Sequence, residues 1–130
     1  MPVLLGISQR SFNPAWSTAS FEAEFYKIHS HIYLFSENEQ PVAYLIIWDL
    51  KEEGEIVSLA VDKGWRNKGI GTKLLSFVFD THPVKAWSLE VDPDNGAAIS
   101  LYEKHKFKRC RVIKDYYGQG KDAVQMTRKL

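Results

Sequence analysis

A glycine-containing loop near the middle of the chain has the clearest chemical meaning in the sequence. It reads Arg66-Asn67-Lys68-Gly69-Ile70-Gly71 and lies between a predicted strand and a predicted helix that begins near Thr72. Backbone N–H groups at such a junction point outward at the positive end of the helix dipole, where they favour a phosphate-bearing ligand. The two glycines permit close approach to the backbone, and the arginine and lysine add positive charge. These residues, together with Thr72, therefore predict a phosphate-binding site.

A tight turn without any ligand is the alternative for this loop, because glycine turns of that kind are common. The chain contains neither G-x-G-x-x-G nor G-x-x-x-x-G-K-[ST], which sets aside the two familiar nucleotide-binding motifs. The four histidines lack the spacing of a metal site, so no metal is expected. The single cysteine, Cys110, has no neighbouring histidine in sequence and is expected to be an inert structural thiol.

Composition limits the classes to which the protein can belong. The chain has 130 residues, of which 45% are hydrophobic and 25% charged, values typical of one globular domain covering residues 1–130. Its 17 Lys and Arg against 16 Asp and Glu give a net charge of +1, which lacks the positive field of a dedicated nucleic-acid binder. No segment approaches the roughly 20 apolar residues of a membrane span, and the lone cysteine suits a reducing compartment. We therefore expect a cytoplasmic protein that does not insert into membranes.

The elements that must position the loop are predicted from hydrophobic periodicity and turn residues. In chain order they are a helix over 2–10, a turn at 13–14, a helix capped by Ser17, strands over 31–35 and 42–48 joined by a loop over 36–41, a strand over 55–61, a helix from about 72, a strand over 86–91, a helix capped by Asp94 or Asn95, and strands over 107–113 and 123–127 around a loop that contains Tyr116 and Tyr117. This order predicts an α/β fold, with helices between the later strands of a mixed sheet.

Four short segments occur in a fixed order that resembles the GNAT acetyltransferase superfamily. They are Leu59-Ala60-Val61-Asp62, the loop from Arg66 to Gly71, Leu89-Glu90-Val91 and the helical segment from Asn95 to Glu103. Within the superfamily the chain is most similar to the RimI-type ribosomal-protein-alanine N-acetyltransferases, because of Asn13-Pro14-Ala15-Trp16-Ser17 and of Tyr116-Tyr117 followed by Asp122-Ala123. The similarity covers nearly the whole chain and implies a single-domain GNAT fold.

The resemblance assigns the glycine loop to the pyrophosphate of acetyl-CoA, which agrees with the chemistry of its residues. In the family, the strand before this loop splays and offers backbone groups to the pantetheine arm and the thioester carbonyl. That role falls here on Leu59, Ala60 and Val61. Asn95 matches an asparagine that contacts the pantetheine region, although a helix cap explains it equally well.

Glu90 and Tyr102 match the residues that the RimI-type family uses as general base and general acid. A carboxylate can accept a proton from an α-amine, whose reference pKa is about 7.7–8.0, before the neutral amine attacks. A tyrosine hydroxyl can protonate the departing CoA thiolate, and Tyr102 is also expected to contact the cofactor. Without the resemblance, a solvent-facing strand glutamate and a core tyrosine would be the simpler explanations.

The acceptor side is predicted from aromatic residues. Tyr116 and Tyr117 present large, stiff surfaces near polar backbone, which suits recognition of a few N-terminal residues beside Glu90. Packing of the two rings against the ends of the sheet is the alternative. Trp16 either lines the other side of this groove or belongs to the core. The basic residues between 104 and 114 are expected to lie on solvated faces, with contact to the ribosome or to an acidic partner as the alternative.

The chain departs from the family at two places. Met1-Pro2 already aligns with the first helix of the family, so the strand that precedes this helix is expected to be absent or truncated, with a start codon assigned too late as the alternative. Lys106 replaces the usual glycine before Phe107. If that position needs a positive φ, lysine costs roughly 1 kcal/mol there relative to glycine.

These features predict an acyltransferase that moves the acetyl group of acetyl-CoA to a protein N-terminal amine by direct attack in a ternary complex. The expected acceptor is the N-terminal alanine of a small-subunit ribosomal protein. Two alternatives stay open at this point. One is a small-molecule amine acetyltransferase, and the other is a noncatalytic acetyl-CoA-binding regulatory module.

Overall fold

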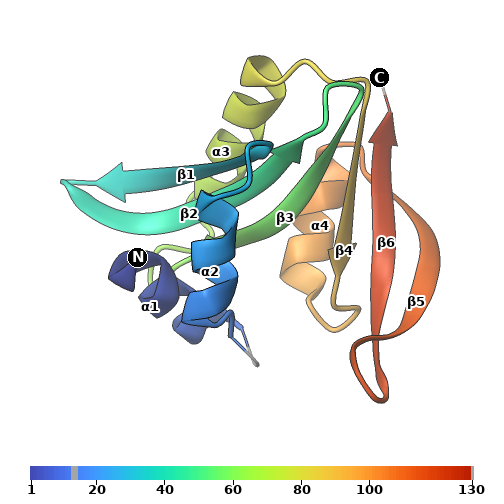
Figure 1. Cartoon of the computed structure of the whole chain (residues 1–130), viewed down its shortest axis with the longest axis horizontal. Coiled ribbons are helices and arrows are strands. Elements are labelled where there is room, and N and C mark those ends of the chain that lie inside the picture. The colour runs from blue at the N-terminus through green and yellow to red at the C-terminus, as the bar shows by residue number, and fades with distance from the viewer. Residues whose placement is uncertain (13–14, 130) are drawn as a thin grey trace.

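The computed structural model describes residues 1–12 and 15–129, which build a six-stranded mixed sheet with helices on both faces (Figure 1). The predicted α/β class, with helices between the later strands, is confirmed. The predicted turn at Asn13-Pro14 lies outside the described residues. The elements are, in chain order, α1 (Pro2–Ser11), α2 (Thr18–Phe25), β1 (Ser30–Glu37), β2 (Gln40–Asp49), β3 (Glu53–Val61), α3 (Ile70–Thr81), β4 (Ala86–Val91), α4 (Gly96–Lys104), β5 (Lys108–Gly118) and β6 (Lys121–Lys129).

The strands follow the order β1-β2-β3-β4-β6-β5 across the sheet. β3 and β4, at its centre, run parallel, whereas the other neighbouring strands are antiparallel. Because parallel neighbours need a crossover connection, the chain passes through α3 between them. Figure 1 shows α1 and α2 on one face of the sheet and α3 and α4 on the other.

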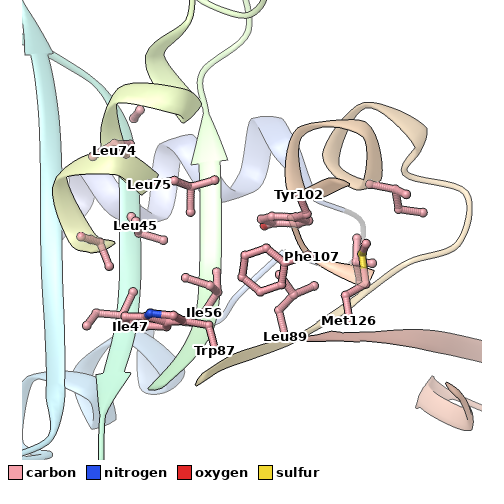
Figure 2. Close-up of a cluster of buried hydrophobic side chains, with 14 of the residues drawn as sticks. Leu45, Ile47, Ile56, Leu74, Leu75, Trp87, Leu89, Tyr102, Phe107 and Met126 are labelled. Carbon is pink, nitrogen blue, oxygen red and sulfur yellow. The ribbon is translucent and has the colours of Figure 1, made fainter. Parts of the chain in front are cut away.

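Two hydrophobic clusters attach the helices to the sheet. The larger cluster lies under α3 and α4 and includes Leu75, Leu89 and Phe107, which are all fully buried or nearly so (Figure 2). The smaller cluster lies under α1 and α2 and includes Ile7 and Phe21. Burying an aliphatic or aromatic side chain of this size stabilises the fold by about 1.5–3 kcal/mol. Both faces of the sheet centre are therefore fixed by packing.

Two predicted loops are corrected by the structure. The loop expected over residues 36–41 is shorter, because β1 and β2 extend into it and leave only Asn38 and Glu39 between them. Both residues have positive φ, 49° and 67°, so a two-residue turn reverses the chain. Tyr116 and Tyr117, expected in a loop, belong to β5, because that strand continues to its turn with β6.

The structure also shows the surroundings of the single cysteine and of the groups that could bind a metal. Cys110 is exposed on β5, and its Sγ lies 2.9 Å from Oγ1 of Thr127 on β6. Among the described side chains, no three His, Cys, Asp or Glu groups come together in a way that could hold a metal ion. None of the helices in the described part of the chain has the length and apolar character needed to cross a membrane.

Candidate functional site

A split between β3 and β4 opens the centre of the sheet. The two strands pair only over their first four positions, from Glu53 opposite Ala86 to Ile56 opposite Leu89. At the end of this stretch the register between β2 and β3 shifts, which leaves Val57 as an extra residue in β3. A bulge of this kind bends the strand and increases its twist. The last part of β3 therefore pairs with β2 on one side and turns its other edge toward the space beside β4.

A cleft of about 560 Å³ lies along this free edge. Its walls come from the end of β3, the glycine loop, the first turn of α3 and one side of α4, a combination of segments that are distant in sequence. The cofactor residues predicted from the sequence that line it are Leu59, Ala60, Val61, Arg66, Asn67, Gly69, Ile70, Gly71, Thr72, Asn95 and Tyr102. Lys68 does not line the cleft itself, but its Nζ lies 5.3 Å from the centre of the Trp65 ring, which does.

The N-terminus of α3 faces this cleft with its backbone donors uncapped. Gly69 precedes the helix in a left-handed conformation with φ +78°, and no side chain caps the first turn. The helix therefore begins at Ile70, two residues before the predicted start near Thr72. Because the first N–H groups of a helix have no partner within it, they are available to an anion in the cleft.

Gly71 has a packing role that the sequence did not indicate. A Cβ atom at this position would lie 2.9 Å from Cδ2 of Leu101 on α4. The absence of a side chain therefore lets the start of α3 approach α4 closely, and so sets the width of the cleft between them. The predicted contact of Gly71 with a phosphate remains a prediction.

Arg66 and Arg10 join the end of α1 to the cleft. Arg66 donates from Nε to the carbonyl oxygen of Val61 at 2.9 Å and from Nη2 to Oγ of Ser11 at 3.3 Å. Arg10 makes a two-pronged ion pair with Asp62, with Nε–Oδ1 and Nη2–Oδ2 distances of 2.6 and 2.7 Å. This pairing holds the pKa of the buried Asp62 carboxyl below its usual value.

The cleft is also lined by residues that the sequence did not indicate. Ser11 and Phe12 line it from the end of α1, and Lys104 lines it from the last turn of α4. No local pattern marks them, because their position depends on how α1 and α4 dock on the sheet. Lys104 belongs to the basic run that was expected to be solvated.

Asn95 acts as the N-cap of α4. Its Oδ1 accepts a hydrogen bond from the backbone N–H of Ala98 at 3.2 Å. The capping alternative is therefore confirmed, while the predicted contact with a pantetheine arm remains a prediction. Asn95 lines the cleft in the same conformation, so one side chain is available for both roles.

Tyr102 is fixed by the way α4 ends. The N–H of Phe107 donates to the carbonyl of Tyr102, and the N–H of Lys106 donates to the carbonyl of Glu103, both at 3.0 Å. These two bonds make a Schellman motif, which needs a left-handed residue after the helix, and Lys106 supplies it with φ +71°. The ring of Phe107 packs edge-on against Tyr102, with centroids 5.7 Å apart. Lys106 therefore meets the condition, a positive φ, under which lysine is less stable than glycine at this position.

Burial also controls the chemistry of Tyr102. Only 6% of its surface is exposed, and this burial raises the pKa of its hydroxyl well above the ordinary value. Because the phenol is held in its neutral form, it keeps its proton at physiological pH. Tyr102 reaches the cleft from α4, as a proton donor in that position would have to.

Glu90 lies on β4, directly after the last residue that pairs with β3. Its neighbour Leu89 points into the core under α3 and α4, so the alternation of the strand directs Glu90 to the opposite face. Partial burial raises the pKa of Glu90, and the negative charge of Glu55 on β3 raises it further. Glu90 does not line the 560 Å³ cleft and stands on the other side of the split.

Tyr116 and Tyr117 accompany Glu90 on this side. They lie on β5 with their rings edge-to-face and 4.9 Å apart, and 49% and 39% of their surfaces are exposed. Burial raises the pKa values of both hydroxyls, and the charge of Glu90 adds to the effect. Tyr117 also raises the pKa of Tyr102, which makes it an electrostatic neighbour of both predicted catalytic residues.

Trp16 is not part of this group. Its ring packs 5.0 Å from that of Phe21 and joins the cluster under α1 and α2. The core alternative for Trp16 therefore has direct structural support. Its predicted contact with an acceptor remains a prediction.

Comparison with known proteins gives a consistent result. The family described as "Acetyltransferase (GNAT) family" matches residues 1–107. The [Ribosomal protein bS18]-alanine N-acetyltransferase of Salmonella typhimurium is 30% identical, over 98% of this chain and 89% of that enzyme. The crystal structure of the ribosomal-protein-S18-alanine N-acetyltransferase from Escherichia coli superposes with a TM-score of 0.88 at 27% identity, covering 98% of this chain and 86% of that one.

Relatives with a broader name match over a shorter stretch. The N-alpha-acetyltransferase of Saccharolobus solfataricus is 41% identical over 85 residues, which are 62% of this chain and 51% of that enzyme. The chain thus spans about half the length of the N-alpha-acetyltransferases that it matches.

Proposed function

The chain belongs to the GNAT acetyltransferase family, and on that premise we propose that it transfers the acetyl group of acetyl-CoA to the α-amine at the N-terminus of a protein. One observation carries this proposal, namely that two binding features meet in one cleft. The uncapped N-terminus of α3 suits a diphosphate, and the free edge of β3 suits an extended chain that contains amide groups. Acetyl-CoA has both parts, since its diphosphate is followed by a pantetheine arm that contains two amide groups.

Different segments of the cleft hold different parts of acetyl-CoA. Backbone N–H groups from Gly69 to Thr72 hold the diphosphate, and the positive charge of Lys104 lies along the same cleft. Backbone groups from Leu59 to Val61 hold the pantetheine amides in the manner of a neighbouring strand. Acetyl-CoA supplies an acetyl group already activated as a thioester. A backbone N–H of β3 is then in place to stabilise negative charge on the thioester oxygen.

Glu90 accepts the proton of the acceptor ammonium, directly or through a water molecule. Its raised pKa makes it a stronger base than an exposed glutamate, and the acceptor amine has a reference pKa of about 7.7–8.0. Tyr116 and Tyr117 provide a rigid aromatic surface beside this carboxylate for the first residues of the acceptor. The split between β3 and β4 connects the acceptor side with the cleft.

Tyr102 donates a proton to the sulfur of the leaving CoA. Its raised pKa keeps the hydroxyl protonated until a stronger base, the thiolate, forms beside it. No covalent intermediate with the enzyme is needed, since the amine attacks the thioester directly in the ternary complex. This scheme uses no thiol, and the exposed Cys110 has its Sγ 2.9 Å from Oγ1 of Thr127.

The acceptor that we favour is the N-terminal alanine of a small-subunit ribosomal protein. Support comes from the relatives at 30% and 27% identity, whose names specify that reaction, over nearly the whole chain. The relatives named only for N-alpha-acetylation support the coarser statement, a protein N-terminus. A single cysteine in the sequence is consistent with work in the reducing cytoplasm, where new protein N-termini are made.

A panel of acceptors tests the proposal. Purified protein is incubated with acetyl-CoA and either peptides with a free N-terminal alanine, the same peptides with a blocked N-terminus, or polyamines, and the products are measured by intact mass. We expect rapid acetylation of the free alanine peptides alone. A preference for polyamines would make the protein a small-molecule acetyltransferase. Tight binding of acetyl-CoA without transfer to any acceptor would indicate a regulatory module.

A further inference from the structure

A row of polar side chains crosses the sheet at Glu90. Gln125 on β6 stands directly opposite Glu90 on β4, and Arg111 on β5 stands directly opposite Gln125. Opposite residues on antiparallel strands have their Cβ atoms about 4.5–5.5 Å apart on the same face. The alternation on β6 agrees, because the neighbours Val124 and Met126 are buried in the core while Gln125 is only half-buried.

The hydrogen bond between Arg111 and Gln125 orients the Gln125 amide. Arg111 donates from Nε to Oε1 of Gln125 at 3.0 Å. This bond fixes which end of the Gln125 amide faces Arg111, and the NH₂ end is left for the carboxylate of Glu90 on the other side. An amide that is free to turn could present either end to Glu90, but Arg111 has no acceptor atom and so selects one orientation.

We propose that Gln125, oriented by Arg111, holds the carboxylate of Glu90 toward the acceptor amine, which makes Gln125 and Arg111 positioning residues for the transfer reaction. The proposal rests on the proposed function insofar as Glu90 is the base. Neither residue belongs to the motifs that indicated the site in the sequence. Arg111 was counted there among the basic residues of a solvated face.

The groups around Glu90 shift its pKa in opposite directions, and Gln125 and Arg111 act in the lowering direction. Burial and the charge of Glu55 on β3 raise the pKa of Glu90, whereas the side-chain amide of Gln125 and the charge of Arg111 lower it. Burial raises the pKa values of Tyr116 and Tyr117 on β5, and the charge of the same carboxylate adds to the effect. Without the row, burial and Glu55 would act unopposed, and Glu90 would be protonated over a wider range of pH. A protonated Glu90 cannot accept the proton of the amine.

The test measures the titration of Glu90 and the rate of transfer in the same variants. Gln125→Met keeps the length of the side chain but removes both amide contacts, and Arg111→Met removes the donor and its charge. We expect the Glu90 carboxyl resonance, assigned with Glu90→Gln, to titrate at higher pH in both variants. We also expect kcat/KM at pH 6 to fall about tenfold, as for loss of one hydrogen bond to a charged group, and to recover at higher pH.

Two controls separate positioning from a general effect on the strands. Arg109→Met makes the same change of charge on β5, but Arg109 stands opposite Met126, and it should leave the Glu90 titration unchanged. Arg111→Lys keeps a donor and a charge, and it should restore most of the rate. Thermal melts confirm that each variant is folded.

The outcomes are distinct. If Glu90 titrates in folded Gln125→Met and Arg111→Met as it does in the wild type, the positioning role is wrong, whatever the rates are. If Glu90 titrates at higher pH in both variants but the wild-type protein acetylates no acceptor, the effect of Gln125 and Arg111 on Glu90 is correct and the proposed function is wrong.

Discussion

Individual residues in this protein both stabilise the fold and line the cleft. Asn95 caps α4 and lines the cleft, and Tyr102 belongs both to the core and to the cleft wall. The carbonyl of Tyr102 accepts the bond that closes the end of α4, so its position is set by the backbone as well as by packing. Chemistry at these positions can therefore be tested only with substitutions that preserve shape.

Tyr102→Phe is such a substitution. We expect the variant to fold and to bind acetyl-CoA nearly as well as the wild type, because the ring and its contact with Phe107 are kept. We expect kcat to fall by about 10²-fold, since no group replaces the hydroxyl as proton donor. Steady-state kinetics and calorimetry with acetyl-CoA measure the two effects. An unchanged kcat would mean that the thiolate leaves without help from Tyr102.

Thr72→Glu tests the anion site without damaging the fold. A carboxylate in the first turn of α3 interacts favourably with the helix dipole, so the free protein should be at least as stable as the wild type. The same charge repels a diphosphate, and acetyl-CoA affinity should fall by about tenfold or more. Ser76→Glu places the charge one turn later, on the exposed side of α3, and is the matched control. Equal affinity of both variants for acetyl-CoA would mean that the diphosphate does not bind at the N-terminus of α3.

At the scale of elements, the split between β3 and β4 creates the site, and the sequence predicted the strands but not the split. Hydrophobic alternation identified β3 and β4 within two residues, because alternation is a local property. The bulge at Val57 depends on the register against β2, which no single strand contains. Ser11, Phe12, Gln125 and Arg111 were missed for the same reason. The glycine loop was found because its conformational and electrostatic requirements are local.

The end of α4 gives a prediction about stability alone. Lys106 adopts φ +71° in the Schellman motif, a conformation that costs a non-glycine residue about 1 kcal/mol. Lys106→Gly should therefore raise the stability by about that amount, or roughly 3–5 °C in Tm for a chain of this length. Thermal unfolding checks this value. A lower Tm would mean that the lysine side chain contributes more than its backbone costs.

The attachment of α1 to β3 predicts a dependence on pH. Asp62 has a lowered pKa in the folded protein because Arg10 donates to it, so its pair stabilises the fold above the unfolded pKa of about 3.9. That contribution is lost as the pH falls through the lower pKa of the folded state. Asp62→Asn should have a lower Tm than the wild type at pH 7, and the difference should shrink below about pH 4. A difference that stays constant from pH 7 to pH 3 would contradict the pairing.

For the whole molecule, the residues predicted to bind the cofactor and those predicted to bind the acceptor lie on two sides of the split. The cleft opens beside α3 and α4, while Glu90 and the tyrosines of β5 gather on the other side of the split. Acetyl-CoA and the acceptor can therefore approach from different sides and meet at the end of β3. This separation allows transfer in a ternary complex, in which both substrates are bound at the same time.

The most direct test of this account gives the enzyme a choice between two amines in one molecule. A peptide with a free N-terminal alanine and an internal lysine is incubated with acetyl-CoA, and tandem mass spectrometry locates the acetyl group. We expect acetylation of the α-amine, whose reference pKa of about 7.7–8.0 leaves a proton that Glu90 can accept, whereas the lysine pKa is about 10.4. Acetylation of the lysine, or of neither amine under conditions in which acetyl-CoA is bound, would contradict it.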